Sequence, residues 1–238
     1  DFDMKELSIG KNDEGQRLDR FVSKSVPLLP ASLLQKYIRL KRIKINGKRA
    51  ERDTRLHLGD TVQLYINDEF FDTPKQENAY LTVNIPKLNI VYEDENILLC
   101  DKKPGMLVHL GDEGDRNRAE GSEKETLIYL LTAYLVNKGE YDPKNESSFA
   151  PALCNRIDRN TGGLVIAAKT APALREITAL IRERKIEKFY LTVTEGIPPK
   201  AADTLTAYLH KDEKKNKVTL YDAPAPDRMA CKTGYRVL

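Results

Sequence analysis

Apolar residues in the first quarter of the chain change from a helical spacing to the alternation of a strand, and this change limits the folds open to it. Leu18, Phe21 and Val22 recur at the spacing of one helix face. A second helical set follows Pro30-Ala31-Ser32, where Ser32 fits an N-cap or a first-turn position. This second set consists of Leu33, Leu34, Tyr37 and Ile38. The pattern predicts two short amphipathic helices.

Strand signals follow these helices. The segment "RIKINGKRAE" alternates Ile43 and Ile45 with basic residues and contains Asn46-Gly47, two residues that tolerate positive φ and favour a tight hairpin. A later strand is predicted in "GDTVQLYI". Residues 1–66 are therefore expected to form one small domain of helix, helix, hairpin and strand.

The remainder predicts a second α+β domain over residues 89–238, after a linker at 67–88 that lacks sustained periodicity. "NIVYEDENILLCDKKPGMLVH" predicts strand, turn, strand, Pro-Gly turn and strand. The polar residues 111–124 predict a surface loop. Helices are predicted in "ETLIYLLTAYLV" and "APALREITALIRERKI", and strands in "LVIAAK", "KFYLTVTEG", "KVTLY" and "KTGYRVL". We expect a mixed, mostly antiparallel sheet.

Composition argues against several classes of protein. The chain has 238 residues, 40% of them hydrophobic, and no window approaches the about 18 to 20 apolar residues of a membrane helix. Three scattered cysteines and three histidines without partners at ligand spacing argue against a disulfide framework and a metal site. No secretory signal is recognised at the start, so a cytoplasmic protein is expected.

Positive charge is concentrated at the N-terminal end. Residues 1–66 hold 14 Lys+Arg against 9 Asp+Glu, a net charge of +5, whereas the remaining residues carry −2. Lys36 and Arg39 share a helix face, and Lys41, Arg42 and Lys44 continue the charge into the strand. A ridge of this kind binds phosphates, although an ordinary solvated surface would also hold spare cations.

The segment "GQRLDRFVSKSVPLLPASLLQKYIRLKRIKINGKRAERDTRLHLGDTVQLYI", residues 15–66, resembles the alpha-L RNA-binding module of a ribosomal protein and several RNA-modifying enzymes. Its R-L-D opening, I-x-I-N-G turn and late G-D carry the resemblance. The resemblance implies RNA as the partner. The residues expected to contact RNA in this module are Arg17, Lys36, Arg39, Lys41, Arg42 and Lys44.

The stretch "CNRIDRNTGG", residues 154–163, places Asp158 between Arg156 and Arg159. As an isolated segment it is a good turn, because Asp and Asn bond nearby amides and glycine accepts positive φ. The flanking cations favour a second interpretation, in which they keep the carboxylate ionised as a nucleophile. Covalent catalysis without a metal is then the expected chemistry.

With its surroundings, "NRIDRNTGGLVIAAK" resembles the signature of the RluA family of pseudouridine synthases, and "DKKPGMLVH" and "KFYLTVTEG" resemble two further segments of that family. The resemblance implies that Asp158 is the nucleophile, Tyr190 the active-site tyrosine, and Arg156 the arginine that replaces the extruded base in the RNA. Asn155, Ile157 and Gly162 depart from the usual His, Leu and Ser. The family's later arginine-containing segment is not found before Leu238, so we expect the catalytic domain to be incomplete at its C-terminus.

The resemblance predicts a monomeric isomerase that flips uridine out of structured RNA and needs no cofactor. Ribosomal RNA is the expected substrate, and tRNA is the alternative. Two alternatives remain open. One is an RNA-binding protein whose synthase-like domain is catalytically silent. The other is a glycoside hydrolase that pairs Asp158 with Asp101 or Glu187, although sugar clefts favour aromatic platforms and the chain has no tryptophan. His109 is expected to be a packed structural histidine.

Overall fold

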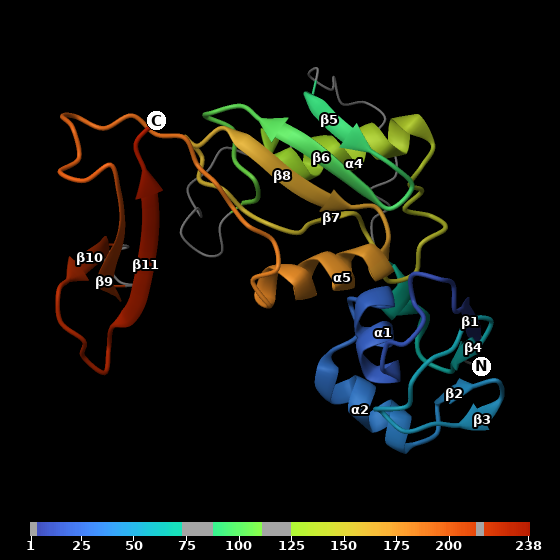
Figure 1. Ribbon diagram of the computed structural model, residues 1–238. Coiled ribbons are helices and arrows are strands. Elements are labelled where there is room, and N and C mark those ends of the chain that lie inside the picture. The colour runs from blue at the N-terminus through green and yellow to red at the C-terminus, as the bar shows by residue number, and fades with distance from the viewer. Residues whose placement is uncertain (1–3, 73–87, 111–124, 213–216) are drawn as a thin grey trace. The chain divides into compact units, whose positions relative to one another are not determined.

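The structure is a computed structural model that describes residues 4–72, 88–110, 125–212 and 217–238 (Figure 1). It divides into two compact units, Asp1–Glu187 and Lys188–Leu238, and each is described by itself. Most of the predicted linker and the whole predicted loop at 111–124 lie outside the described residues. Within the described part, every helix is too short or too polar to cross a lipid bilayer.

The N-terminal part of the first unit packs two helices on a four-stranded antiparallel sheet. In chain order it contains β1 (Lys5–Ser8), α1 (Leu18–Ser25), α2 (Ala31–Arg39), β2 (Ile43–Ile45), β3 (Lys48–Arg49), β4 (Thr61–Leu64) and the 3-10 helix η1 (Asp68–Phe71). The strand order is β1-β4-β2-β3. The two helices, the hairpin and the later strand are confirmed, whereas β1 was not predicted.

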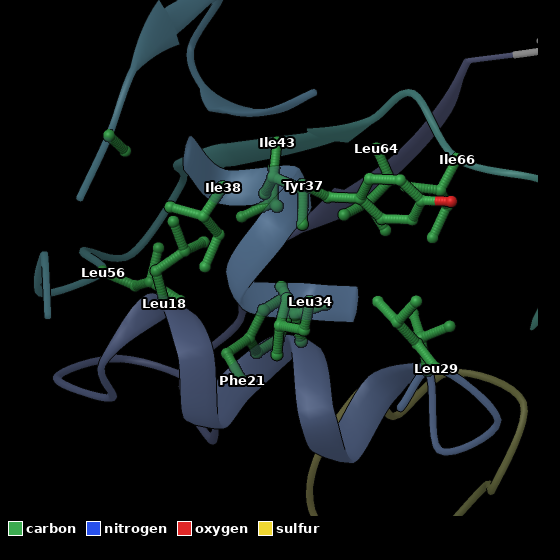
Figure 2. Packing of buried hydrophobic residues seen from close by; sticks show 14 of the residues in the cluster. Leu18, Phe21, Leu29, Leu34, Tyr37, Ile38, Ile43, Leu56, Leu64 and Ile66 are labelled. Atoms are coloured by element: carbon green, nitrogen blue, oxygen red, sulfur yellow. The ribbon is translucent and has the colours of Figure 1, made fainter. Parts of the chain in front are cut away.

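The core of this part consists of the apolar positions whose spacing predicted the helices. Figure 2 shows Leu18 and Phe21 of α1 and Leu34 of α2 facing the residues of the sheet. Phe21 is fully buried, and truncation of such a side chain costs about 3 to 5 kcal/mol. At the hairpin, Asn46 and Gly47 have φ of 50° and 75°, as a type I′ turn requires.

The second part of the first unit packs a helix on another antiparallel sheet. Its elements are β5 (Ile90–Glu93), β6 (Ile97–Lys102), α4 (Leu127–Lys138), β7 (Ala152–Leu153), β8 (Gly163–Ala168) and α5 (Ala171–Arg182). The strand order is β5-β6-β8-β7. Leu127, Leu131 and Leu135 of α4 lie in one buried cluster with Leu98 and Val165 of the sheet, and Figure 1 shows α4 behind this sheet.

The strand predicted for "GMLVH" does not form. The carbonyls of Leu107 and Val108 instead accept hydrogen bonds from the N–H groups of Leu127 and Ile128 at the start of α4, at 2.8 and 3.2 Å. The first N–H groups of a helix have no partner within the helix itself. The carbonyls of this segment therefore satisfy the start of α4 rather than a neighbouring strand.

The second unit is a three-stranded antiparallel sheet. It contains β9 (Ala202–Asp212), β10 (Lys217–Tyr221) and β11 (Met229–Arg236) in the order β10-β9-β11. β10 and β11 confirm two predicted strands, and β9 was not predicted. The strand predicted in "KFYLTVTEG" is absent from the described residues: Phe189 and Leu191 are 86% and 85% exposed, and no neighbouring strand pairs with them. None of the described residues of this unit belongs to a buried apolar core.

A cluster of charges joins three elements of the first unit. Glu93, at the end of β5, accepts hydrogen bonds from Lys138 and Tyr134 of α4 and from Lys169, which follows β8, all at 2.9 Å. Lys169 and Lys138 also pair with Glu140. Burial by itself raises the pKa of Glu93, but the hydrogen bonds from Lys138, Lys169 and Tyr134 outweigh it and lower the pKa to about 2.

We predict that Glu93 makes the stability of the fold sensitive to acid. Because its pKa is lower in the folded chain than the ordinary 4.5, its contribution is complete above pH 4.5 and is lost as the pH falls towards 2. Urea unfolding of Glu93→Gln between these values is expected to show a smaller loss of stability than the wild type. Glu95→Gln, an exposed neighbour, is the control and is expected to follow the wild type. Equal acid sensitivity of the Glu93 variant and the wild type would contradict the assignment.

Candidate active site

Asp158 lies on the loop between β7 and β8, and the start of this loop is tied to β8. The N–H of Cys154 donates to the carbonyl of Ile166 at 2.7 Å. The Asn155 side chain accepts from the N–H of Ile166 at 2.8 Å and donates to the carbonyl of Leu164 at 3.3 Å. The side-chain amide of Asn155 thus forms one donor and one acceptor bond with β8, as the backbone of a paired strand residue would.

The middle of the loop alternates between the core and solvent. Ile157 packs against the buried cluster beneath α4, whereas Arg156 and Asp158 on either side of it are exposed. The N–H of Thr161 donates to the carbonyl of Asp158 at 3.1 Å and closes a turn. The predicted turn is therefore present, and it leaves the carboxylate accessible, as a group that reacts with a large substrate must be.

Lys102, the last residue of β6, lies beneath this loop and is only 1% exposed. Its Nζ donates to the carbonyls of Lys103, Met106 and Arg159 at 3.2, 2.9 and 3.0 Å. An ammonium group has three N–H donors, so three carbonyls satisfy it completely. The side chain therefore joins the end of β6, the turn that follows it and the loop of Asp158.

The turn after Lys102 is the predicted Pro-Gly turn. The N–H of Met106 donates to the carbonyl of Lys103 at 3.4 Å, and Gly105 has a φ of 90°, as the third residue of a type II turn requires. Gly105 and Arg159 exchange two hydrogen bonds, Gly105 N to Arg159 O at 2.8 Å and Arg159 Nε to Gly105 O at 3.0 Å. The turn and the loop of Asp158 are thus bonded to each other directly.

Gly162 allows this close approach. A Cβ atom at Gly162 would lie 3.1 and 3.2 Å from two ring carbons of Pro104, closer than most Cβ contacts. Gly163, the first residue of β8, has a φ of 130° that L side chains rarely adopt. Gly162 is therefore favoured because a side chain would meet Pro104, and Gly163 because its backbone conformation disfavours other residues.

The electrostatics differ from the expectation that two arginines hold Asp158. Among the described residues, Asp158 forms no ion pair with Arg156 or Arg159, and the Arg159 guanidinium bonds the Gly105 carbonyl instead. Lys102 lies near enough for its charge to act: burial lowers the pKa of Lys102, and the negative charge of Asp158 opposes that shift. Sequence reasoning missed Lys102, although it stands inside the quoted motif "DKKPGMLVH".

Arg156 lies close to His109. Burial lowers the pKa of the half-buried His109, and the positive charge of Arg156 lowers it further. The segment that ends at His109 and the loop of Asp158 therefore meet where Lys102 and Gly105 bond Arg159, and the charges of Asp158 and Arg156 act across the same region on Lys102 and His109. Segments about 50 residues apart in the chain form one surface here.

The candidate RNA-binding cations fall into two groups. Lys36 and Arg39 are exposed on α2, and Lys41 continues from them towards β2. Arg42 and Lys44 lie over the rings of Tyr37 and Tyr65 at 5.4 and 5.2 Å. These residues come from α2, the turn after it and β2, and the continuous ridge predicted from the sequence stays a prediction.

Arg17 lies apart from this ridge. It precedes α1 and forms a two-point ion pair with Asp19, with Nε to Oδ1 at 3.1 Å and Nη2 to Oδ2 at 2.6 Å. The hydrogen bond to Asp19 raises the pKa of Arg17. The R-L-D opening therefore has a structural use within this part of the chain.

Tyr190 belongs to the second unit, where its side chain is 63% exposed. Asp158 belongs to the first unit, and the predicted place of Tyr190 beside it stays a prediction. The carboxylate pair of the hydrolase alternative gains no support. Asp101 accepts a hydrogen bond from Asn89 at 3.1 Å and, as the strand neighbour of Lys102, its side chain leaves the opposite face of β6.

Comparison with known families agrees with this geometry. A family model described as RNA pseudouridylate synthase matches residues 96–238, which include both segments that meet around Asp158. The chain belongs to the RNA pseudouridylate synthase family. The S4 domain matches residues 16–62 of this synthase-family chain, so the resemblance to the alpha-L module is confirmed as well.

Several relatives of the synthase family cover most of the chain. An "Uncharacterized RNA pseudouridine synthase" of Mycoplasma genitalium is 31% identical over 94% of this chain and 66% of the relative. "Ribosomal large subunit pseudouridine synthase C" of Buchnera aphidicola is 32% identical over 89% of this chain and 62% of the relative. The human structure "RNA Pseudouridylate Synthase Domain Containing 1" has a TM-score of 0.47 and 15% identity, over 64% of this chain and 52% of that chain. The chain thus spans about three fifths to two thirds of these curated relatives.

We predict that replacing Lys102 destabilises the fold. Lys102→Met removes three hydrogen bonds and leaves backbone carbonyls without partners, which is expected to cost more than about 2 kcal/mol of unfolding free energy. Urea unfolding measures this loss. Lys103→Met, at the exposed neighbour, is the matched control and is expected to stay within about 0.5 kcal/mol of the wild type. Similar unfolding curves for the two variants would refute the role given to Lys102.

Proposed function

We propose that the protein isomerises uridine to pseudouridine in structured RNA, with Asp158 as the reacting carboxylate. The observation that carries the proposal is the exposed Asp158, on a loop bonded to the Pro-Gly turn through buried Lys102, within the part of the chain that matches the synthase family. A carboxylate presented in this way can approach a sugar carbon without a metal.

Ribosomal RNA is the proposed substrate. The S4 match and the exposed cations of α2 support RNA as partner, because lysines and arginines gathered on one element neutralise phosphates. The name of the Buchnera relative supports ribosomal RNA over tRNA. We further propose that the protein acts as a cytoplasmic monomer, with residues 1–66 as the RNA-binding domain, 67–88 as the linker and 89–238 as the catalytic domain.

The reaction breaks the bond between uracil N1 and ribose C1′ and forms a bond between uracil C5 and the same carbon. The C5 proton leaves and N1 is protonated, so substrate and product are isomers and no oxidant or reductant is consumed. The Asp158 carboxylate faces the sugar and stabilises C1′ while uracil is detached and turned. The hydrogen bonds of Asn155, Lys102 and Arg159 hold the loop in place, so the carboxylate needs little reorganisation during the step.

A base within a helix is out of reach of Asp158, so the uridine has to leave its stack at a cost of a few kcal/mol. In the proposed mechanism Arg156, exposed two residues from Asp158, occupies the vacated position in the RNA. Tyr190 contacts the flipped uracil by stacking. Phosphate contacts to Lys36, Arg39 and neighbouring cations offset the cost of unstacking.

We predict that Asp158→Asn abolishes modification without loss of folding or RNA binding. The change removes the charge and keeps the shape, and among residues 4–72, 88–110, 125–212 and 217–238 none forms a hydrogen bond with the Asp158 side chain that it could break. The rate of pseudouridine formation is expected to fall by about 10⁴-fold or more. Mass spectrometry of RNA from cells that lack the gene, treated with the full-length protein, measures this rate.

Asn160→Ala, an exposed change in the same loop, is the matched control and is expected to modify the same uridines as the wild type. Activity of the Asp158 variant at the wild-type rate would exclude Asp158 as the reacting group. RNA binding without modification by the wild type would favour the catalytically silent alternative.

A further inference from the structure

A basic cleft lies where the N-terminal part of the first unit meets α5. Its volume is about 520 Å³. The cations that line it are Arg17, Arg20 and Lys24 from α1 and its start, Arg55, and Arg175 from α5. Figure 1 shows α5 next to α1, although about 150 residues separate them in the chain. The S4 match supplies four of these cations, and the synthase match supplies Arg175.

The two walls of the cleft are fixed to each other by polar contacts. The Ser148 hydroxyl donates to Asp13 at 2.5 Å and accepts from Gln16 Nε2 at 2.8 Å. Asn12 donates to Glu146 at 2.8 Å and accepts from the N–H of Ala171, at the start of α5, at 2.9 Å. Asp13 is only 3% exposed, so its contact is shielded from water. The cleft is therefore preformed, and its cations do not depend on a binding partner to bring them together.

Positive charge in the cleft is only partly compensated. Asp19 pairs with Arg17, Lys24 donates to Gln16, and Arg55 donates to the carbonyl of Gly15. Arg20 and Arg175 are exposed, and within the described residues no hydrogen bond or ion pair to either guanidinium is found. Glu14 is the acidic residue of the lining. Like charges gathered in a cleft attract an anion from solution.

The lining favours a phosphate backbone over a base. Stacking on an exposed aromatic ring is the usual way to hold an unpaired base. The aromatic residue of the lining, Phe149, is 9% exposed and offers no open ring face. Guanidinium groups bind phosphate oxygens in a two-point geometry, and such contacts fix the position of a nucleic acid without reading its sequence.

We propose that this cleft binds the sugar–phosphate backbone of the RNA substrate, with Arg20 and Arg175 each contacting a phosphate. The inference rests on the proposed function, since it takes RNA as the substrate. The cleft would be a second region of RNA contact besides the cations of α2. Arg175, from the synthase part, would contact the same RNA segment as Arg20, from the S4 part. The register between the RNA-binding part and the loop of Asp158 then depends on both arginines.

Salt-dependent binding tests the cleft. The full-length protein and its Arg20→Ala and Arg175→Ala variants are titrated with two fluorescein-labelled stem-loop RNAs of unrelated sequence, between about 50 and 200 mM salt. Each variant is expected to bind both RNAs roughly tenfold more weakly. Each is also expected to reduce the slope of log K against log salt by about 0.7 to 1, as the loss of one phosphate contact requires. Arg175→Lys keeps the charge and is expected to recover part of the affinity.

Lys5→Ala is the matched control, because Lys5 is an exposed cation of the same N-terminal part and does not line the cleft. It is expected to leave the affinity and the salt slope unchanged. A loss with Arg20→Ala alone would overturn the shared cleft, and so would wild-type binding by both variants.

Modification assays separate the two proposals. If the wild type forms pseudouridine while both arginine variants keep the wild-type affinity and KM, the cleft proposal is wrong and the proposed function stands. If the wild type forms no pseudouridine on any RNA, the proposed function itself fails. The cleft proposal expects a raised KM with an unchanged kcat at saturating RNA for both variants, because the contact is made equally before and during the reaction.

Discussion

The buried ammonium group of Lys102 is the interaction on which the candidate site depends. Three carbonyls surround it, from both sides of the Pro-Gly turn and from Arg159 in the loop of Asp158. A charge so deeply buried is unfavourable unless each of its protons finds an acceptor. The loop that carries Asp158 is thus tied down, at Arg159, by a residue that the sequence presents as an ordinary lysine at the end of a strand.

Much of the fold could be predicted because local pattern and tertiary packing agree. The helical spacing of Leu18 and Phe21 and the Asn46-Gly47 turn each correspond to an observed element. The strand prediction failed at Leu107, whose carbonyl accepts from the start of α4. Apolar alternation records which side chains can be buried together and carries no information about which N–H group a given carbonyl will accept from.

The sequence identified Asp158 as the candidate carboxylate, but it did not identify the charged groups around it. Adjacent arginines in the sequence suggested that Asp158 is held by its neighbours, but Arg159 bonds Gly105, and Lys102, 56 positions earlier in the sequence, lies near enough for the charge of Asp158 to act on it. Long side chains choose partners in three dimensions, and sequence proximity is a poor guide to that choice. In the second unit the strands are paired, but several apolar side chains, such as Leu220, are exposed, so strand pairing there could be predicted from the sequence without a buried core.

The near contact between Gly162 and Pro104 couples two positions that are far apart in the sequence. A serine at 162, the residue that the RluA signature usually has, would carry its Cβ to within 3.1 Å of the proline ring, which would then have to give way by a few tenths of an ångström. A substitution at position 162 therefore changes which side chains fit at position 104. In a lineage that alternates between glycine and serine here, compensating substitutions are to be sought at the turn.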